Sequence, residues 1–233
     1  MITKEQIVKN LMERYQKKDI ESRLDKGQFQ TLFREAVKDY YPKLKKQYAD
    51  QSIYGISFEI GDVIQKVYAE NFQTYIYFNT EEMYQEAIED CEEDEKSYYR
   101  FEAWAEWDVV CAESALFENV QNYLEQNSLY ACNSVSDYED KLETAAAAWY
   151  QENHLEFEDA FEEECSQIRM WMAKVLGELR KDGFWKEQGN AGLYVIPFSG
   201  ECDVETEELI ETYHIMDSGC HGTEYVDYLK SCE

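Results

Sequence analysis

The chain has 233 residues, enough for one large domain or two small ones with a sizeable buried core. Hydrophobic residues make up 44% of it and aromatic residues 15%, including 19 tyrosines, so the composition excludes a disordered acidic tail. Its 22 basic and 50 acidic residues give a formal net charge of −28, which disfavours contact with nucleic acid phosphates and anionic membranes. We therefore expect a basic protein partner, no direct nucleic acid binding and no membrane association.

The charge is unevenly distributed along the chain. Residues 1–50 contain 12 Lys and Arg and 8 Asp and Glu, a net charge of +4. Because the whole chain has a net charge of −28, residues 51–233 carry a net charge of −32.

The seven cysteines are odd in number and never spaced as Cys-x-x-Cys. The charged start MITKEQIVKN lacks the apolar region of a signal peptide. These features predict reduced thiols and a cytoplasmic location.

The first 50 residues predict two amphipathic helices. Thr3 and Gln6 form a capping box that precedes apolar residues at helical spacing up to Tyr15. A second helix is expected from about Gln28, and Pro42 should end it or begin the next turn. Its apolar face comprises Phe29, Leu32, Phe33, Ala36, Val37 and Tyr40.

Residues 53–78 predict three short strands. In Ile53–Ile60, every second residue is apolar, which is typical of a half-buried strand, and Gly61-Asp62 then indicates a hairpin turn. Val63–Ala69 and Phe72–Phe78 are expected to form the next two strands. Short strands in such close succession favour an antiparallel meander.

The remaining segments are mostly helical. Asn79 or Thr80 should cap a helix with Glu81 and Glu82 in its first turn. The buried stripe of that helix is predicted to be Met83, Ala87, Ile88 and Cys91. Further helices are expected around 116–124, from Ser136, over about 155–181 with a stop at Gly183, and over 204–212 and 223–231. The apolar segment 193–198 contains Pro197, which predicts an edge strand.

The fold class that follows is α+β, with a small antiparallel β-meander flanked by helices and a mostly helical C-terminal half. We assign residues 1–132 to an α+β domain with the antiparallel sheet, and residues 133–233 to a mainly helical portion packed on it. The two portions form either one domain or two closely packed lobes.

The most distinctive motif is the aromatic block YYRFEAWAEW at residues 98–107. The charges among its aromatic residues are mainly acidic, which argues against the stacking of single-stranded nucleic acid. Either the block packs over the edge of the sheet, or it forms an aromatic binding surface with acidic rims. The binding residues of the second interpretation are Tyr98, Tyr99, Trp104, Glu106 and Trp107, with Glu92, Glu93 and Asp94 from the acidic run before them.

Catalytic and metal signatures are weak. The acidic run from Asp90 fails the EF-hand pattern, because Glu95 and Phe101 occupy the positions of the required Gly and Glu. His214, Cys220 and His221 could be a zinc pair or a thiol with its base, but zinc needs at least one more ligand and the usual finger spacings are absent. With no phosphate-binding or nucleophile motif either, we expect no enzyme activity, no cofactor and no bound metal.

The N-terminal half resembles bacterial domain-of-unknown-function family 4303. The resemblance rests on the order of YGISFEI (54–60), FNTEEMYQEA (78–87) and YYRFEAWAEW (98–107). Phe101 stands where the family usually has Trp, and Ala103-Trp104 stand where Ser-Pro is common. The resemblance implies an α+β fold without an established activity, in a group of small acidic proteins that resemble bacterial immunity proteins.

Three functions follow from these features. The favoured one is a non-enzymatic protein of the bacterial toxin-immunity type, whose acidic, aromatic face covers a basic surface such as that of a nuclease toxin. The first alternative is a DNA mimic that inhibits a DNA-binding protein, of the anti-restriction or anti-CRISPR type. The second is a metal- or thiol-dependent enzyme that uses His214, Cys220 and His221.

Overall fold

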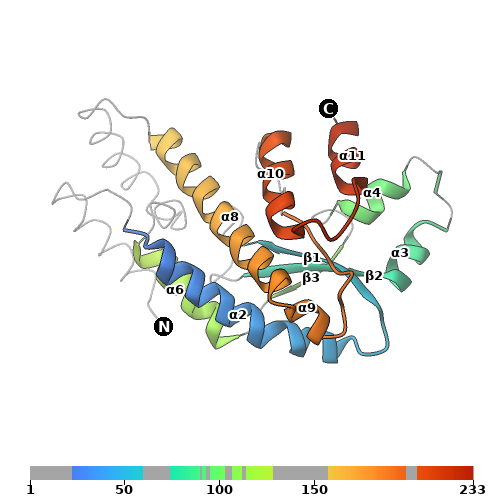
Figure 1. Ribbon diagram of the computed structural model, residues 1–233, viewed down its shortest axis with the longest axis horizontal. Coiled ribbons are helices and arrows are strands. Elements are labelled where there is room, and N and C mark those ends of the chain that lie inside the picture. Colours follow the sequence, from blue (N-terminus) through green and yellow to red (C-terminus); the bar gives the residue numbers. More distant parts are fainter. Residues whose placement is uncertain are drawn as a thin grey trace, which may run out of the picture.

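A computed structural model of the chain describes residues 23–59, 74–89, 91–92, 95–102, 107–111, 114–127, 157–197 and 204–232. These residues form a four-stranded mixed sheet with helices packed on both faces (Figure 1). The α+β class and the mostly helical C-terminal half that the sequence predicts are therefore confirmed.

The strand order is β3-β2-β1-β4. β1 (Ile53–Glu59) pairs antiparallel with β2 (Tyr75–Thr80), which pairs antiparallel with β3 (Asp108–Cys111). β4 (Tyr194–Val195) runs parallel to β1 and lies at the edge, as the Pro197 argument predicts. The meander is thus extended by one parallel strand from the C-terminal half, which places residues 194–195 next to residues 55–56.

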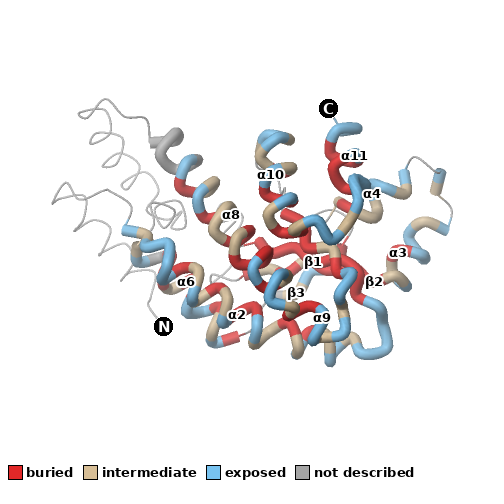
Figure 2. Tube along the Cα trace, in the orientation of Figure 1, coloured by how far each residue is buried: buried red, intermediate tan, exposed pale blue. Residues whose placement is uncertain are grey.

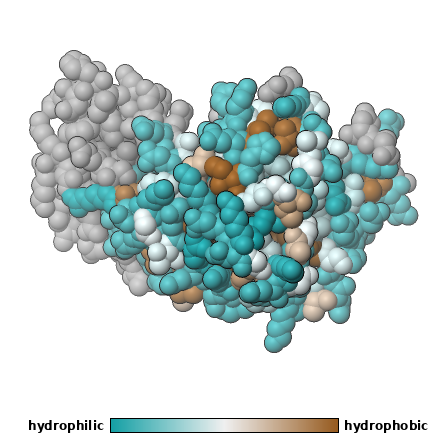
Figure 3. Space-filling model, viewed as in Figure 1, coloured by the Kyte–Doolittle hydropathy of each residue, from teal (hydrophilic) through white to brown (hydrophobic). Residues whose placement is uncertain are grey.

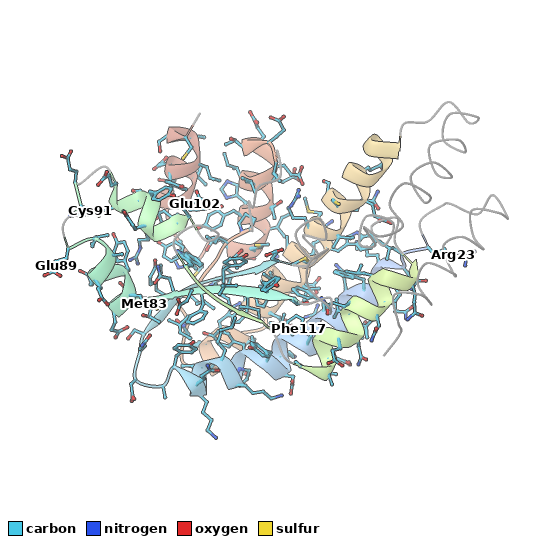
Figure 4. All side chains as sticks on the ribbon, turned by 180° about the vertical axis from the view of Figure 1, so that it is seen from behind. Arg23, Met83, Glu89, Cys91, Glu102 and Phe117 are labelled. Carbon is cyan, nitrogen blue, oxygen red and sulfur yellow. The ribbon has the colours of Figure 1, made fainter. Side chains whose placement is uncertain are left out.

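One face of the sheet packs on α2 (Lys26–Gln47), α6 (Ala115–Asn127), α8 (Phe157–Lys181) and α9 (Phe184–Glu187). The core on this face is aliphatic and rich in phenylalanine. Phe33, for example, contacts Phe58 of β1 and Phe117 of α6 with ring centroids 5.7 and 6.3 Å apart. Phe117 points from α6 toward the sheet (Figure 4).

The other face packs on α3 (Glu81–Ala87), α4 (Lys96–Phe101), α10 (Thr206–Asp217) and α11 (Glu224–Ser231). The strands are mostly buried and lie in the middle of the molecule between the two helical layers (Figure 2). Both predicted portions therefore contribute to both cores. The boundary at 132/133 lies outside the described residues and stays a prediction.

Two helix starts show how local sequence sets the elements. The Asp25 carboxylate accepts a hydrogen bond from the Gln28 N–H at 2.7 Å and begins α2. Thr80, one of the two predicted caps, accepts from the Met83 N–H at 3.1 Å, with Glu81 and Glu82 in the first turn of α3. That cap prediction is confirmed.

Three local predictions are wrong. β1 is buried along its whole length rather than on one face, because a helical layer covers each side and even Ser57 and Glu59 are enclosed. Pro42 lies inside α2 and does not end it, since the neighbouring Tyr41 and Leu44 are anchored in the core on either side of it. The buried residue of α3 is Tyr84, and the predicted stripe of Met83, Ala87, Ile88 and Cys91 is half-buried or exposed.

Other predictions hold within the described residues. The 116–124 helix, the long helix that ends before Gly183 and the two C-terminal helices are present as α6, α8, α10 and α11. The first predicted helix, the 61–62 turn, the strand Val63–Ala69 and the helix from Ser136 lie outside the described residues.

The two layers meet where α8 crosses α10. A Cβ atom at Gly177 of α8 would lie 2.1 Å from the Ile215 carbonyl oxygen of α10, so only glycine permits this approach of the two backbones. A second close approach occurs at Gly55 of β1, where a Cβ would lie 2.4 Å from the Trp107 ring. These contacts place α10 and Trp107 against the rest of the fold.

Replacing Gly177 with alanine should therefore destabilise the protein by about 1–3 kcal/mol, the usual range for overpacking. The clash is with backbone, so no side-chain rotation can relieve it. Urea unfolding of Gly177→Ala measures the loss. The matched control is Gly192→Ala, because a Cβ there meets no atom within 4 Å, and it should change stability by no more than about 0.5 kcal/mol. Equal stability of the two variants would contradict the described crossing.

Candidate functional site

The sheet face under α10 and α11 is rich in tyrosine. We call the following residues the tyrosine layer: Tyr54, Tyr77, Tyr84, Tyr194, Tyr213, Tyr225 and Tyr228. Their rings pack edge-to-face and tilted, as for Tyr213 and Tyr225 with centroids 4.6 Å apart. A tyrosine ring supplies apolar contact area and carries a hydroxyl that can bond a polar group at the edge of the layer.

Two of these hydroxyls bond to carboxylates. Tyr77 donates to Glu59, which is buried in the sheet, at 2.8 Å, and Tyr228 donates to Glu102 at the end of α4. Burial, together with the Glu102 carboxylate, raises the pKa of Tyr228 well above its usual value, so that the hydroxyl keeps its proton and remains a donor. The tyrosines thus provide donors for acidic side chains drawn into the packing.

Arg100 joins α4 to the layer. Its guanidinium lies over the Tyr54 and Tyr84 rings, 4.3 and 4.8 Å from their centroids, and donates two hydrogen bonds of 3.1 and 3.3 Å to Glu81 of α3. Burial alone would lower the pKa of Arg100, but the hydrogen bonds and charge of Glu81 outweigh it and the pKa is raised. The charge of Arg100 therefore persists and joins α4 to the acidic helix α3 and to the Tyr54 ring of the sheet.

The predicted binding residues divide between surface and core. Tyr98 is 39% exposed on α4 and contacts the Tyr99 ring edge-on at 5.6 Å. Trp107 is buried against Tyr54 and Gly55, so it belongs to the core and offers no surface anchor. Glu92 is exposed after α3. Glu93, Asp94, Trp104 and Glu106 lie outside the described residues.

Charge separates between the two helical layers. We call α3, α4, α10 and α11 with their described flanks, residues 81–102 and 204–232, the acidic layer. Its described residues include 14 Asp and Glu and three Lys and Arg, whereas the four helices of the opposite layer, α2, α6, α8 and α9, contain 11 acidic and 11 basic residues, with the basic excess on α2. Figure 4 shows Glu89 and Cys91 of the acidic layer at one end of the molecule and Arg23, which precedes α2, at the other.

The acidic layer has few exposed apolar side chains. Among the described residues, Tyr98 and Val109 are the large hydrophobic side chains that are exposed. The face over α10 and α11 is accordingly mostly hydrophilic, with small hydrophobic patches (Figure 3). None of the described helices is long and apolar enough to cross a bilayer.

The second candidate site is the turn between α10 and α11. The His221 Nδ1 atom contacts the Asp217 carboxylate, and the His221 Nε2 atom lies 3.0 Å from the Gly192 carbonyl oxygen. The imidazole stacks on Tyr194 of β4 with ring centroids 3.8 Å apart. The turn is thus attached to the segment that leads into β4.

This geometry disfavours the predicted thiol–base pair. Both nitrogens of His221 face oxygen atoms, and the Cys220 sulfur lies 3.6 Å from the Ala191 carbonyl oxygen, so the ring and the thiol are not paired as base and nucleophile. His214 is exposed on α10 and does not join the cluster. Asp217, which the sequence analysis did not single out, is its third member, and its spacing of four residues from His221 was the available signal.

Arg180 of α8 holds the same segment from the other side. It donates to the carbonyl oxygens of Ala191 at 3.4 Å and Leu193, and also to Met216 of α10 at 3.2 Å. Consecutive carbonyls of residues 191–193 therefore accept hydrogen bonds from Arg180 and His221, which positions the short strand β4.

Comparisons with models of known protein families, with curated proteins and with solved structures found no match to this chain. The candidate sites therefore rest on the geometry of this chain alone.

The Asp217 carboxylate should make stability depend on acid pH. Its burial alone would raise its pKa, but hydrogen bonds from the His221 backbone and side chain outweigh this and lower the pKa below the ordinary value of 3.8. A lowered pKa in the folded state contributes stability that is present above about pH 4 and is lost as pH falls through the folded pKa. Asp217→Asn should cost about 2 kcal/mol at pH 6, and this difference should shrink toward pH 2.

Urea unfolding from pH 6 to pH 2 measures that difference. The control is Asp182→Asn, at an exposed carboxylate 3.9 Å from Arg34, which should change stability little at any of these pH values. An Asp217→Asn deficit that stays constant down to pH 2 would show that the ionised carboxylate is not the stabilising species.

Proposed function

We propose that this protein is a non-enzymatic binding protein whose acidic layer captures a basic protein partner. The observation that carries the proposal is the uneven distribution of charge, with 14 acidic and three basic side chains in the acidic layer and equal numbers of both in the four helices of the opposite layer. A random scatter of 50 acidic residues would serve solubility alone. A polarised surface also orients an approaching basic protein.

The acidic side chains in this layer are of two kinds. Four are engaged by neighbouring side chains: Glu81 by Arg100, Glu102 by Tyr228, Glu208 by Arg169 of α8, and Asp217 by His221. Another set is exposed to solvent and is available for steering: Glu82, Glu86, Glu89, Glu92, Glu95, Glu205, Glu207, Glu211, Glu224 and Asp227. Ordered packing beneath exposed charges gives a preformed surface, which reduces the ordering cost of binding.

Tyr98 is the aromatic anchor that the described surface supports. It is exposed on α4 between Glu95 and the Arg100 clamp, and its neighbour Tyr99 is half-buried against the tyrosine layer. An exposed tyrosine on a packed base resembles the aromatic hot spots of protein interfaces.

The concrete form we favour is a bacterial toxin-immunity inhibitor that covers the basic surface of a toxin such as a nuclease. The acidic layer has the charge that such a surface requires. His221 has both nitrogens engaged, which weighs against the thiol-dependent alternative.

Association with the partner should depend steeply on salt. The tagged protein is used to isolate its partner from the native host, and rate constants are then measured between about 50 and 500 mM salt, over which the screening length shrinks roughly threefold. The association rate should fall strongly and the dissociation rate should change less. Glu207→Lys with Glu211→Lys should slow association further, whereas the control Glu35→Lys on α2 should not.

The identity of the partner separates the alternatives, since a toxin supports immunity and a restriction or CRISPR component supports DNA mimicry. An affinity that is indifferent to salt over this range, or an equal effect of the α10 and α2 variants, would refute the acidic-layer proposal.

Tyr98→Ala should act on the dissociation rate instead. If Tyr98 is an interface anchor, its loss should cost about 2 kcal/mol of binding without changing thermal stability, because its side chain is exposed. The control is Val109→Ala, at the other large exposed side chain, on the edge strand β3. Unchanged binding by Tyr98→Ala would remove α4 from the interface.

A further inference from the structure

We propose that Asp217, Cys220 and His221 form a binding site for one divalent cation of the zinc class. The proposal is independent of the partner-binding function. The sequence predicts no bound metal, but the fold brings a third ligand, Asp217, to Cys220 and His221. Among the described residues this is the group of His, Cys and acidic side chains whose ligand atoms converge.

The donor set suits zinc. One carboxylate oxygen, one thiol sulfur and one imidazole nitrogen lie within 4.8 Å of one another. Zinc bonds of about 2.0–2.3 Å place tetrahedral ligands roughly 3.5 Å apart, so zinc binding would require the close contact between His221 Nδ1 and the Asp217 carboxylate to open and the Cys220 sulfur to lie within this spacing. Cations that prefer oxygen ligands, such as Mg²⁺, would not favour a thiolate and an imidazole.

The orientation of His221 gives an independent argument. In the metal-free protein Nε2 faces the Gly192 carbonyl oxygen and Nδ1 donates a hydrogen bond to the Asp217 carboxylate, and a bound metal ion would take the place of the Nδ1 proton. Two acceptors in contact need an electropositive atom between them, either a proton on the ring or a metal ion. A backbone carbonyl that fixes the far nitrogen is also the usual outer partner of a metal-binding histidine.

The surroundings hold the ligands in place. Tyr194 stacks on the imidazole, and Asp217 is buried at the C-terminal end of α10 and accepts the His221 backbone N–H at 2.9 Å. Cys220 is exposed and its sulfur lies 3.6 Å from the Ala191 carbonyl oxygen, so it can turn toward the other ligands. Three protein ligands leave one tetrahedral position for water.

Binding would deprotonate the Cys220 thiol and release its proton to solvent, with a sulfur–zinc bond formed in its place. Zinc would then connect the α10–α11 turn through His221 to the segment that leads into β4. The expected consequence is a protein that is more resistant to heat with zinc than after chelation.

The test uses the full-length protein, stripped with a chelator and titrated with Zn²⁺ and Co²⁺. We expect one zinc per chain by elemental analysis, and a thiolate-to-cobalt charge-transfer band with Co²⁺. Cys220→Ser should abolish the band and weaken zinc binding at least tenfold. Its site is exposed, so circular dichroism should show an intact fold. His221→Gln should weaken binding similarly.

Matched controls come from ligand-type residues outside the cluster. Cys232→Ser and His214→Gln are exposed and should leave the band and the zinc affinity unchanged. Absence of zinc binding by the wild-type protein would overturn the proposal, as would a band that survives Cys220→Ser. Zinc affinity that falls with His214→Gln rather than with His221→Gln would place the site elsewhere.

Discussion

The clamp that Arg100 makes with Glu81, Tyr54 and Tyr84 is the interaction on which the acidic layer depends. A layer this rich in carboxylates repels itself, and it can pack on a sheet only where donors compensate the acidic groups. Arg100 provides a permanent positive charge beside Glu81, and tyrosine hydroxyls provide neutral donors to Glu59 and Glu102. Tyrosine suits this layer because its ring fills the core while its hydroxyl can donate to an acceptor, as Tyr77 and Tyr228 do.

The position of α10 follows from a second constraint, the close crossing at Gly177. Because α10 lies so near α8, its C-terminal end reaches the segment before β4, where Asp217, His221 and Arg180 converge. The same arrangement turns the outer faces of α10 and α11 toward solvent with their glutamates. Packing within the layer and charge on its surface are therefore consequences of one geometry, and the proposed partner surface and the proposed metal site share its framework.

Much of this fold can be predicted from residue patterns. Period-2 alternation located β1, the Thr80 cap located α3, and helical periodicity located α6 and α8. The complete burial of β1 could not be predicted, because Ser57 and Glu59 suggest a solvent-facing side until the second helical layer and Tyr77 are in place. The parallel pairing of β4 with β1 joins residues about 140 positions apart, and no local pattern encodes it.

The candidate sites, like the fold, could be predicted from the sequence only in part. The aromatic block is distinctive in the sequence, but single-sequence patterns do not separate exposed Tyr98 from buried Trp107, since that depends on Gly55 beneath the indole ring. Cys220 and His221 were identified by residue type, whereas Asp217 was one acidic residue among 50 until the turn brought it to the imidazole. His214, equally suggestive in sequence, faces solvent.

The central claim is that the acidic layer is the face that meets a partner. Hydrogen–deuterium exchange of the protein alone and in complex with its isolated partner tests it most directly. The account predicts new protection in α4, α10 and α11, with α2 unchanged. Protection confined to α2, or spread equally over both helical layers, would contradict it.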